Sequence, residues 1–246
     1  MLRHLKTAFT VITLTFLFSN VACADIVISG TRIIYRGAQK DVSVRLENKG
    51  SRPLLVQNWL DTGNDNIEPG AIKVPFNATL PVSRIDPKKG QTIKIMYTSA
   101  QSLPADRESV FWFNVLEVPP KAAKEDAGAT QNTLQLAFRT RIKLFYRPQG
   151  LADLAGEAPA KLTWKIKSEQ GKPAIAVNNP TPYYVSFNSI ELESAGKKYA
   201  INGQMAAPLS ETVFTFKNPV SASSGKINYS FINDFGGIIS ASTDLR

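Results

Sequence analysis

The chain alternates apolar and polar side chains in short runs that Gly, Pro, Asn and Asp separate. This period of two is typical of β-strands with one buried and one exposed face. No segment keeps the period of an amphipathic helix, so the sequence predicts an all-β protein. Strands are expected at residues 26–35, 42–47, 54–60, 72–80, 92–97, 110–118 and 134–146, and then at 162–167, 174–177, 183–192, 198–201, 212–217, 226–232 and 238–242.

Seven strands on each side of one turn-rich stretch predict two β-sandwich domains. The stretch runs from residue 147 to the Ala-, Gly- and Pro-rich segment ending at Pro159, and is expected to be a hinge and surface linker. We place the domains at residues 25–148 and 149–246. Residues 121–132 are small, polar and charged, and are expected to form a loop before the last strand of the first domain.

That last strand has the strongest pattern in the chain. Its even positions are apolar except for Thr140, and its odd positions carry three cations: Leu134, Leu136, Phe138 and Ile142 against Arg139, Arg141 and Lys143. At about fifteen residues it is roughly twice the usual strand length, so one half can lie in its own sheet while the other is available to a partner. An open apolar edge is an aggregation hazard, and self-association of the free protein is one way to cover it.

Residues 1–24 have the features of a secretory signal peptide. A basic start is followed by an apolar run at 8–18, too short to span a bilayer, and by a small-residue cleavage site at 22–24. We therefore expect the mature chain to begin at Asp25 and to be exported, without insertion in a membrane.

Cleavage there removes the only cysteine and the only histidine, Cys23 and His4. A Ser-His-Asp triad, a cysteine nucleophile and the common zinc sites are thereby excluded. A carboxylate pair of glycosidase type or a Ser-Lys dyad stays open, although no spacing singles one out. The sequence predicts neither enzyme activity nor a cofactor, and a fold held together without disulfides.

The charge balance admits several kinds of partner. Of the 29 basic residues, Arg3 and Lys6 leave with the signal peptide, so 27 basic and 20 acidic side chains remain, a net charge of +7. Most cations are scattered, and no basic groove with interleaved aromatic residues stands out. Nucleic acid is therefore disfavoured as a partner of this exported chain.

Several segments of the chain form a characteristic set. The most diagnostic is LPADRESVFWFNVLEVPP at 103–120. The others are SGTRIIY at 29–35, LENKG at 46–50, PLLVQNWLD at 53–61, RIKLFYRP at 141–148, NPTPYYVSF at 179–187 and INDFGG at 232–237. Together they resemble the periplasmic chaperones of the chaperone-usher pilus pathway. The resemblance covers nearly all of the mature chain, and it implies two immunoglobulin-like domains in a boomerang with a cleft between them.

The resemblance also implies roles for individual residues. Arg32 and Lys143 match the pair that anchors the C-terminal carboxylate of a pilus subunit. Leu134, Leu136 and Phe138 match the donor residues that complete the open core of a subunit by β-augmentation.

Three further matches, Glu108, Arg147 and Asp234, correspond to an interdomain ion network that sets the cleft angle. The absence of a cysteine pair and the moderate loop at 121–133 favour the subgroup with a short loop before the donor strand.

The function implied is that of a periplasmic chaperone. Such a protein binds and folds pilus subunits by donor-strand complementation and delivers them to an outer-membrane usher. The alternatives are a pilus subunit or adhesin, and a carboxylate-dependent glycosidase.

Overall fold

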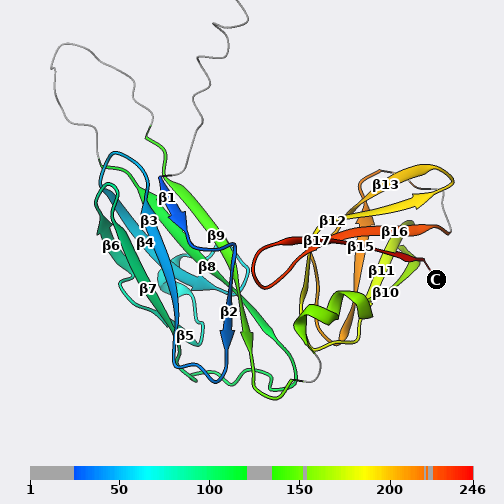
Figure 1. Ribbon diagram of the computed structural model, residues 1–246, viewed down its shortest axis with the longest axis horizontal. Helices are drawn as coiled ribbons and strands as arrows, with labels where there is room; N and C mark the ends of the chain where they lie inside the picture. The colour runs from blue at the N-terminus through cyan, green and yellow to red at the C-terminus, as the bar shows by residue number, and fades with distance from the viewer. Residues whose placement is uncertain (1–24, 121–134, 152–153, 219, 221–223, 246) are drawn as a thin grey trace, which may run out of the picture.

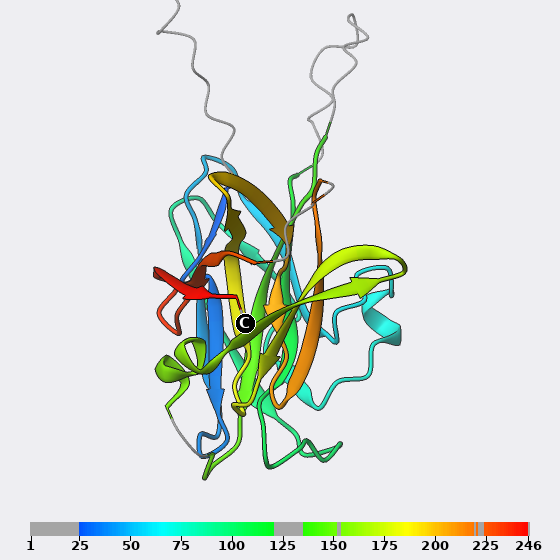
Figure 2. The ribbon, with the colours of Figure 1, turned by 90° about the vertical axis from the view of Figure 1, so that its right-hand side faces the viewer.

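The computed structural model describes residues 25–120, 135–151, 154–218, 220 and 224–245 as two lobes of β-strands set at an angle (Figure 1). Seen from its own side, the second lobe lies in front of the first (Figure 2). The expected signal peptide, the loop at 121–132 and Leu134 lie outside the described residues. Within the described part of the chain, no helix is long and apolar enough to cross a bilayer.

The first lobe is a sandwich of two sheets around one apolar core. The sheets have the strand orders β1-β3-β7-β5 and β2-β9-β8-β4-β6. Alternate side chains such as Phe113 and Leu144 point inward and are fully buried. The strands are β1 (Ile26–Ile28), β2 (Arg32–Arg36), β3 (Val42–Asn48), β4 (Leu54–Asp61), β5 (Phe76–Ala78), β6 (Val82–Ile85), β7 (Gly90–Tyr97), β8 (Ser109–Val118) and β9 (Phe138–Arg147).

The first predicted strand, residues 26–35, is two strands in two different sheets. β1 pairs antiparallel with β3, whereas β2 pairs in parallel with β9. The chain changes sheets at a turn where Gly30 has φ +100°, a conformation that side chains with a Cβ rarely adopt. Apolar residues lie on both sides of the turn, but the buried positions change there from even, at Ile26, to odd, at Ile33 and Tyr35. The prediction of one strand overlooked this change of phase.

This change of sheet leaves half of β9 with an open edge. β2 pairs only with residues 143–147 of β9, while β8 pairs with residues 138–146 on the other side. Among the described strands, none pairs with residues 138–142 along the edge that faces away from β8. Ile142 and Leu144 are buried in the core, but Leu136 and Phe138 are exposed.

The second lobe is a sandwich whose two layers are joined along one side. Its strands follow one path, β10-β11-β15-β13-β12-β16-β17, with β14 paired to β12. β13 makes the join because residues 197–200 pair with β12 and residues 201–202 with β15. The strands are β10 (Thr163–Glu169), β11 (Lys172–Asn179), β12 (Val185–Ser194), β13 (Lys197–Asn202), β14 (Met205–Ala206), β15 (Ser210–Phe216), β16 (Lys226–Ile232) and β17 (Ile238–Asp244).

The predicted all-β fold of two sandwiches is confirmed, with differences in detail. The expected strand at 72–80 is reduced to β5, after a 3-10 turn η1 (Pro69–Ala71), and the pattern missed β6 and β14. The expected surface linker is wrong in part, since it contains a second 3-10 segment, η2 (Ala155–Lys161). Ala158 and Pro159 of η2 are buried, and the Tyr229 hydroxyl donates a hydrogen bond to the Pro159 carbonyl at 2.9 Å.

Candidate functional site

Arg32 and Lys143 lie side by side where the open edge of β9 ends. They are register partners in the parallel pairing of β2 with β9. Their neighbours Ile33 and Leu144 are also register partners, and both point into the core. Because successive side chains alternate between faces, both cations project from the outer face of the sheet, on adjacent strands.

Arg32 is partly buried and only partly satisfied. Its Nη1 donates to the carbonyl oxygen of Ile232 in the second lobe at 2.8 Å, and its guanidinium carbon lies 5.6 Å from the ring centroid of Phe145. Its Nε is buried without a hydrogen-bond partner among the described residues. Burial lowers the pKa of Arg32, and the negative charges of Asp234 and Glu108 offset only part of that effect.

Lys143 has even less compensation. Within the described part of the chain, no hydrogen bond or ion pair holds its ammonium. Burial, followed by repulsion from Arg32, lowers its pKa below the usual value for lysine. Two neighbouring, partly desolvated cations that form no ion pair with a described carboxylate have the chemistry to bind an anion with two acceptor oxygens.

The exposed apolar side chains of the long strand begin a few residues before this cation pair. Leu136 is 53% exposed and Phe138 48% exposed. Phe138 is the register partner of Glu117 on β8, so it belongs to the same face of the sheet as the core residues Phe113 and Ile142. The strand therefore continues the inward-facing apolar row of the first lobe beyond the point where its own sandwich covers that row. The third residue expected here, Leu134, lies outside the described residues.

The structure brings Glu108, Arg147 and Asp234 together between the lobes. Arg147 donates from Nε to Glu108 at 2.7 Å, and from Nη1 and Nη2 to Asp234 at 2.9 and 3.1 Å. Burial alone would lower the pKa of Arg147, but the hydrogen bonds to Asp234 and the charge of Glu108 hold it above its usual value. One guanidinium on β9 thus fixes a carboxylate from each lobe.

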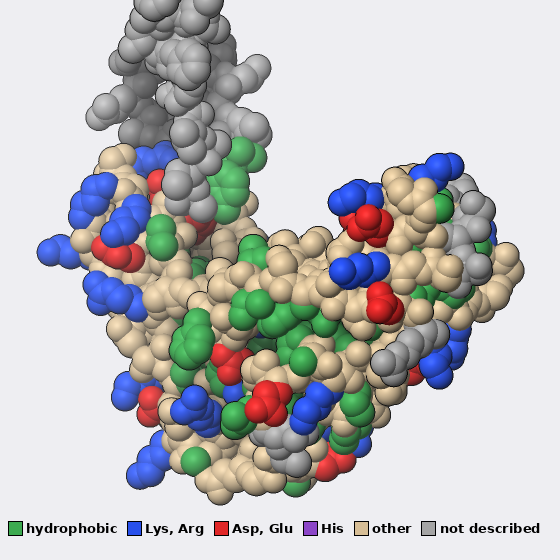
Figure 3. Space-filling view, turned by 45° about the vertical axis from the view of Figure 1, so that its right-hand side comes forward, with side chains coloured by type: hydrophobic (Ala, Val, Ile, Leu, Met, Phe, Trp, Pro, Cys, Tyr) green, Lys and Arg blue, Asp and Glu red, His purple; other side chains and the backbone are tan. Residues whose placement is uncertain are grey.

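Backbone contacts continue this junction. The Glu108 N–H donates to the Pro182 carbonyl at 2.9 Å, and the other carboxylate oxygen of Glu108 accepts from the Tyr184 N–H at 2.9 Å. The rings of Phe145 and Tyr184 pack with centroids 5.9 Å apart. Hydrophobic side chains gather on the surface where the lobes meet (Figure 3). A cavity of about 260 Å³ opens there, lined by residues of both lobes that include Arg32.

Sequence reasoning missed a second charged cluster, on the outer face of the first lobe. Asp61, at the end of β4, is buried and accepts hydrogen bonds from Arg141, from Asn114 at 2.7 Å and from the Gly63 N–H at 2.7 Å, and it forms an ion pair with Arg139 at 3.5 Å.

Each arginine of this cluster also stacks on a tryptophan. The guanidinium of Arg139 lies 4.9 Å from the ring of Trp59, and that of Arg141 5.3 Å from the ring of Trp112. The sequence does contain a signal for this cluster. On each of three strands, two of its residues are two positions apart and so share a face: Trp59 and Asp61, Trp112 and Asn114, and Arg139 and Arg141. These pairs can be recognised as neighbours only once the register of β4, β8 and β9 is known.

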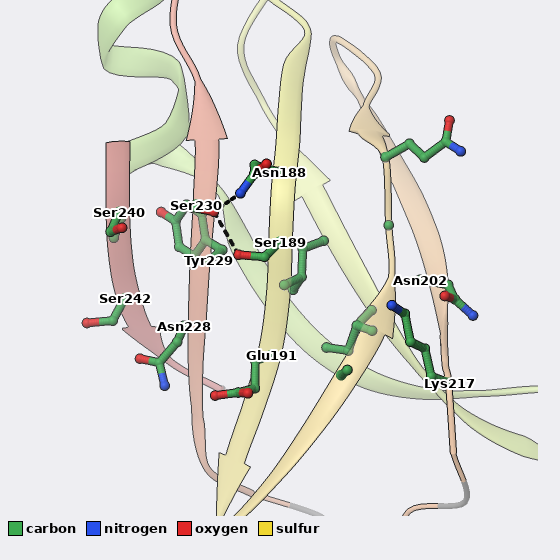
Figure 4. A pocket seen from close by; sticks show the side chains of 16 residues that line it. Asn188, Ser189, Glu191, Asn202, Lys217, Asn228, Tyr229, Ser230, Ser240 and Ser242 are labelled. Carbon is green, nitrogen blue, oxygen red and sulfur yellow. Dashed lines mark hydrogen bonds between the residues drawn. The ribbon is translucent and has the colours of Figure 1, made fainter. Parts of the chain in front are cut away.

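A larger hollow, of about 920 Å³, lies on the second lobe alone (Figure 4). Serine and asparagine side chains of β12, β16 and β17 line much of it. Asn188 donates to the Ser230 hydroxyl at 3.2 Å, and the hydroxyls of Ser189 and Ser230 lie 2.7 Å apart. None of the sequence-predicted site residues lines this hollow. Across the described residues, no group of three or more His, Cys, Asp or Glu is placed to hold a metal ion.

Comparison with known families matches both lobes. Residues 25–152 match the family model described as "Pili and flagellar-assembly chaperone, PapD N-terminal domain". Residues 157–243 match "Pili assembly chaperone PapD, C-terminal domain". Together the two models span nearly all of the described residues.

Individual proteins agree with the family models. The probable fimbrial chaperone YadV of Escherichia coli K12 is 60% identical over 93% of each chain, and the chaperone protein FimB/FhaD of Bordetella pertussis is 43% identical over 88% of this chain and 86% of its own. The crystal structure of the YadV chaperone covers 90% of this chain and 100% of its own with a TM-score of 0.77 at 56% identity. The SafB chaperone, in a Salmonella enterica complex with SafA pilin, covers 92% of this chain and 98% of its own with a TM-score of 0.72 at 25% identity.

Proposed function

The chain belongs to the family of PapD-like pili assembly chaperones, and from that premise we propose that it captures the C-terminal carboxylate of a pilus subunit with Arg32 and Lys143 while β9 completes the subunit's fold. It is a periplasmic fimbrial chaperone that binds pilus subunits, and not an enzyme. The alternatives of a pilus subunit or adhesin and of a glycosidase are set aside by this family membership.

The observation that supports the proposed site is that the open edge of β9 ends at the two cations. A strand added beside residues 138–142 would lie in line with β2 and would meet Arg32 and Lys143 at its end. β9 runs from Phe138 toward Lys143. For the added strand to present its C-terminal carboxylate there, it must run parallel to β9.

The apolar side chains supply the second part of the interaction. Leu136 and Phe138 lie on the face that continues the core row of the first lobe, so they would enter the core of an incomplete partner sandwich beside them. Burial of each such side chain stabilises the complex by about 1.5 to 3 kcal/mol. We propose the same role for Leu134.

Two further elements of this function are proposals. The outer-membrane usher is the proposed recipient of the loaded chaperone, on the strength of family membership. Glu108, Arg147 and Asp234 are proposed to hold the angle between domains 25–148 and 149–246, because one guanidinium binds both carboxylates across the junction.

The carboxylate site is tested by removing one cation. We expect Lys143→Met or Arg32→Met to weaken capture of a pilus subunit by at least about thirtyfold, since loss of one partner of a desolvated charge pair costs about 2 to 5 kcal/mol. Affinity would be measured by calorimetry with synthetic peptides of alternating apolar and threonine residues, ending either in a free carboxylate or in an amide.

The matched control is Arg36→Met. Arg36 lies on the same strand as Arg32 but is exposed, so its loss removes a charge without changing the site. The amide peptide should bind wild type weakly, and the Lys143→Met protein should distinguish the two peptides much less than wild type does. Equal affinity of wild type for both peptides would refute the carboxylate site.

A further inference from the structure

The turn between β16 and β17 exposes the most accessible large apolar side chain of the described residues. Phe235, at the tip of this turn, is 96% exposed, and the first residues of β17, Ile238 and Ile239, are 61% and 44% exposed. An apolar tip of this kind on a soluble protein indicates a contact surface.

Hydrogen bonds hold the turn in place, although the side chain of Phe235 is almost fully exposed. The Asn233 side-chain oxygen accepts from the Phe235 N–H at 3.0 Å and from the Gly237 N–H at 2.9 Å, and the Gly236 N–H donates to the Asn233 carbonyl at 3.0 Å. Asp234 is bound by Arg147. Gly236 lies so near the first lobe that an added Cβ would be 2.6 Å from the Thr31 hydroxyl. The turn is thus fixed against the residue that precedes Arg32.

This surface is continuous with the cation pair. The carbonyl of Ile232, just before the turn, accepts the hydrogen bond from Arg32. Phe235 and Ile239 line the same 260 Å³ cavity as Arg32 and Phe145. Asp234 is turned toward Arg147, which binds both of its carboxylate oxygens, so the apolar side chains of the turn are what it presents beside Arg32.

We propose that Phe235, with Ile239, forms an apolar wall that contacts the side chains of the last residues of a pilus subunit, those next to its terminal carboxylate. The proposal rests on the proposed function, because it places the subunit terminus at Arg32 and Lys143. It adds a specificity determinant from the second lobe: subunits with apolar terminal residues are preferred over those with polar ones.

The test is a double-mutant cycle between Phe235 and the end of a peptide. Two synthetic peptides share an alternating apolar and threonine sequence with a free carboxylate, and differ only in having leucine or serine as the last two residues. Calorimetry compares wild type, Phe235→Ser, Lys143→Met and the control Val213→Ser, an exposed apolar residue of β15 outside the cavity. Thermal unfolding of Phe235→Ser checks that it folds as wild type does.

We expect Phe235→Ser to weaken the leucine-ended peptide about tenfold and the serine-ended peptide less than about twofold, and Val213→Ser to change neither. Equal weakening of both peptides, or of neither, would overturn the apolar wall while a strong Lys143→Met effect leaves the carboxylate site standing. If Lys143→Met itself has no effect, both proposals fall.

Discussion

The outer face of the five-stranded sheet carries two sets of cations that the molecule treats differently. Arg139 and Arg141 share the buried carboxylate of Asp61 and each stacks on a tryptophan. Arg32 and Lys143 begin one step further along the same face, and no described carboxylate forms an ion pair with either. All four residues belong to neighbouring positions of β2 and β9, so the difference lies in their partners and not in their placement.

On the proposed function, this difference separates structural charges from binding charges. A cation that is paired and hydrogen-bonded within the fold stabilises a local arrangement. A desolvated cation without a partner costs free energy in the unbound protein, and this cost is recovered when a ligand carboxylate arrives. The comparison therefore predicts that mutations around Asp61 affect mainly folding, and that mutations around Lys143 affect mainly binding.

The largest expected effect is that of Asp61→Asn. It leaves two guanidinium groups around a buried amide, so we expect the free energy of unfolding to fall by about 3 kcal/mol. Urea unfolding followed by circular dichroism measures this. Asp86→Asn, which breaks only an exposed pair with Arg84, is the control and should leave the midpoint unchanged. A similar midpoint for both variants would mean that the Asp61 cluster is not structural.

A second experiment gives Lys143 a carboxylate of its own. Trp112 is the register partner of Lys143 on β8, so Trp112→Glu places an acid beside the ammonium. We expect it to weaken binding of the carboxylate-ended peptide about tenfold relative to Trp112→Gln, which equally loses the stacking on Arg141. NMR titration should show a higher pKa for Lys143 in the glutamate variant. Equal affinity of the two variants would argue against Lys143 as a binding charge.

The smallest effect concerns pH. Burial and Arg32 lower the pKa of Lys143, whereas a bound carboxylate raises it. Affinity is therefore complete below the pKa of the free chaperone and falls as the pH rises through it, which occurs below the usual value of about 10.4. We expect a several-fold weakening by about pH 10 that is absent in Lys143→Arg, since guanidinium does not titrate there. A pH dependence shared by both proteins would assign the titration to another group.

The strands were largely predictable because alternation encodes which face of a sheet each side chain occupies. The prediction from the pattern was wrong where a local backbone conformation, and not the burial of alternate side chains, decides the path of the chain. The change of sheet at Gly30 interrupts a run that is apolar on both sides. The composition of residues 147–159 predicts a surface linker, yet Pro159 is buried and its carbonyl accepts the hydrogen bond from the distant Tyr229.

The site residues were identified from family resemblance, and only the fold reveals their geometry. Arg32 and Lys143 are more than a hundred positions apart, and the parallel register of β2 and β9 makes them neighbours. The Asp61 cluster was not predicted, because its members lie on three strands. A single sequence does not show which strands pair or in what register. Phe235 was noted only as part of a motif, since nothing in its neighbours predicts that it stays exposed.

The change of sheet at Gly30 also fixes where an added strand would end. β2 occupies the edge of β9 from Lys143 onward, so on the proposed function a subunit strand paired with residues 138–142 would stop at Arg32 and Lys143. The place of each earlier subunit side chain would then follow from its distance to the terminal carboxylate, because successive side chains alternate between the two faces of a strand. An interior segment of a chain, which has no terminal carboxylate, would have no such fixed register.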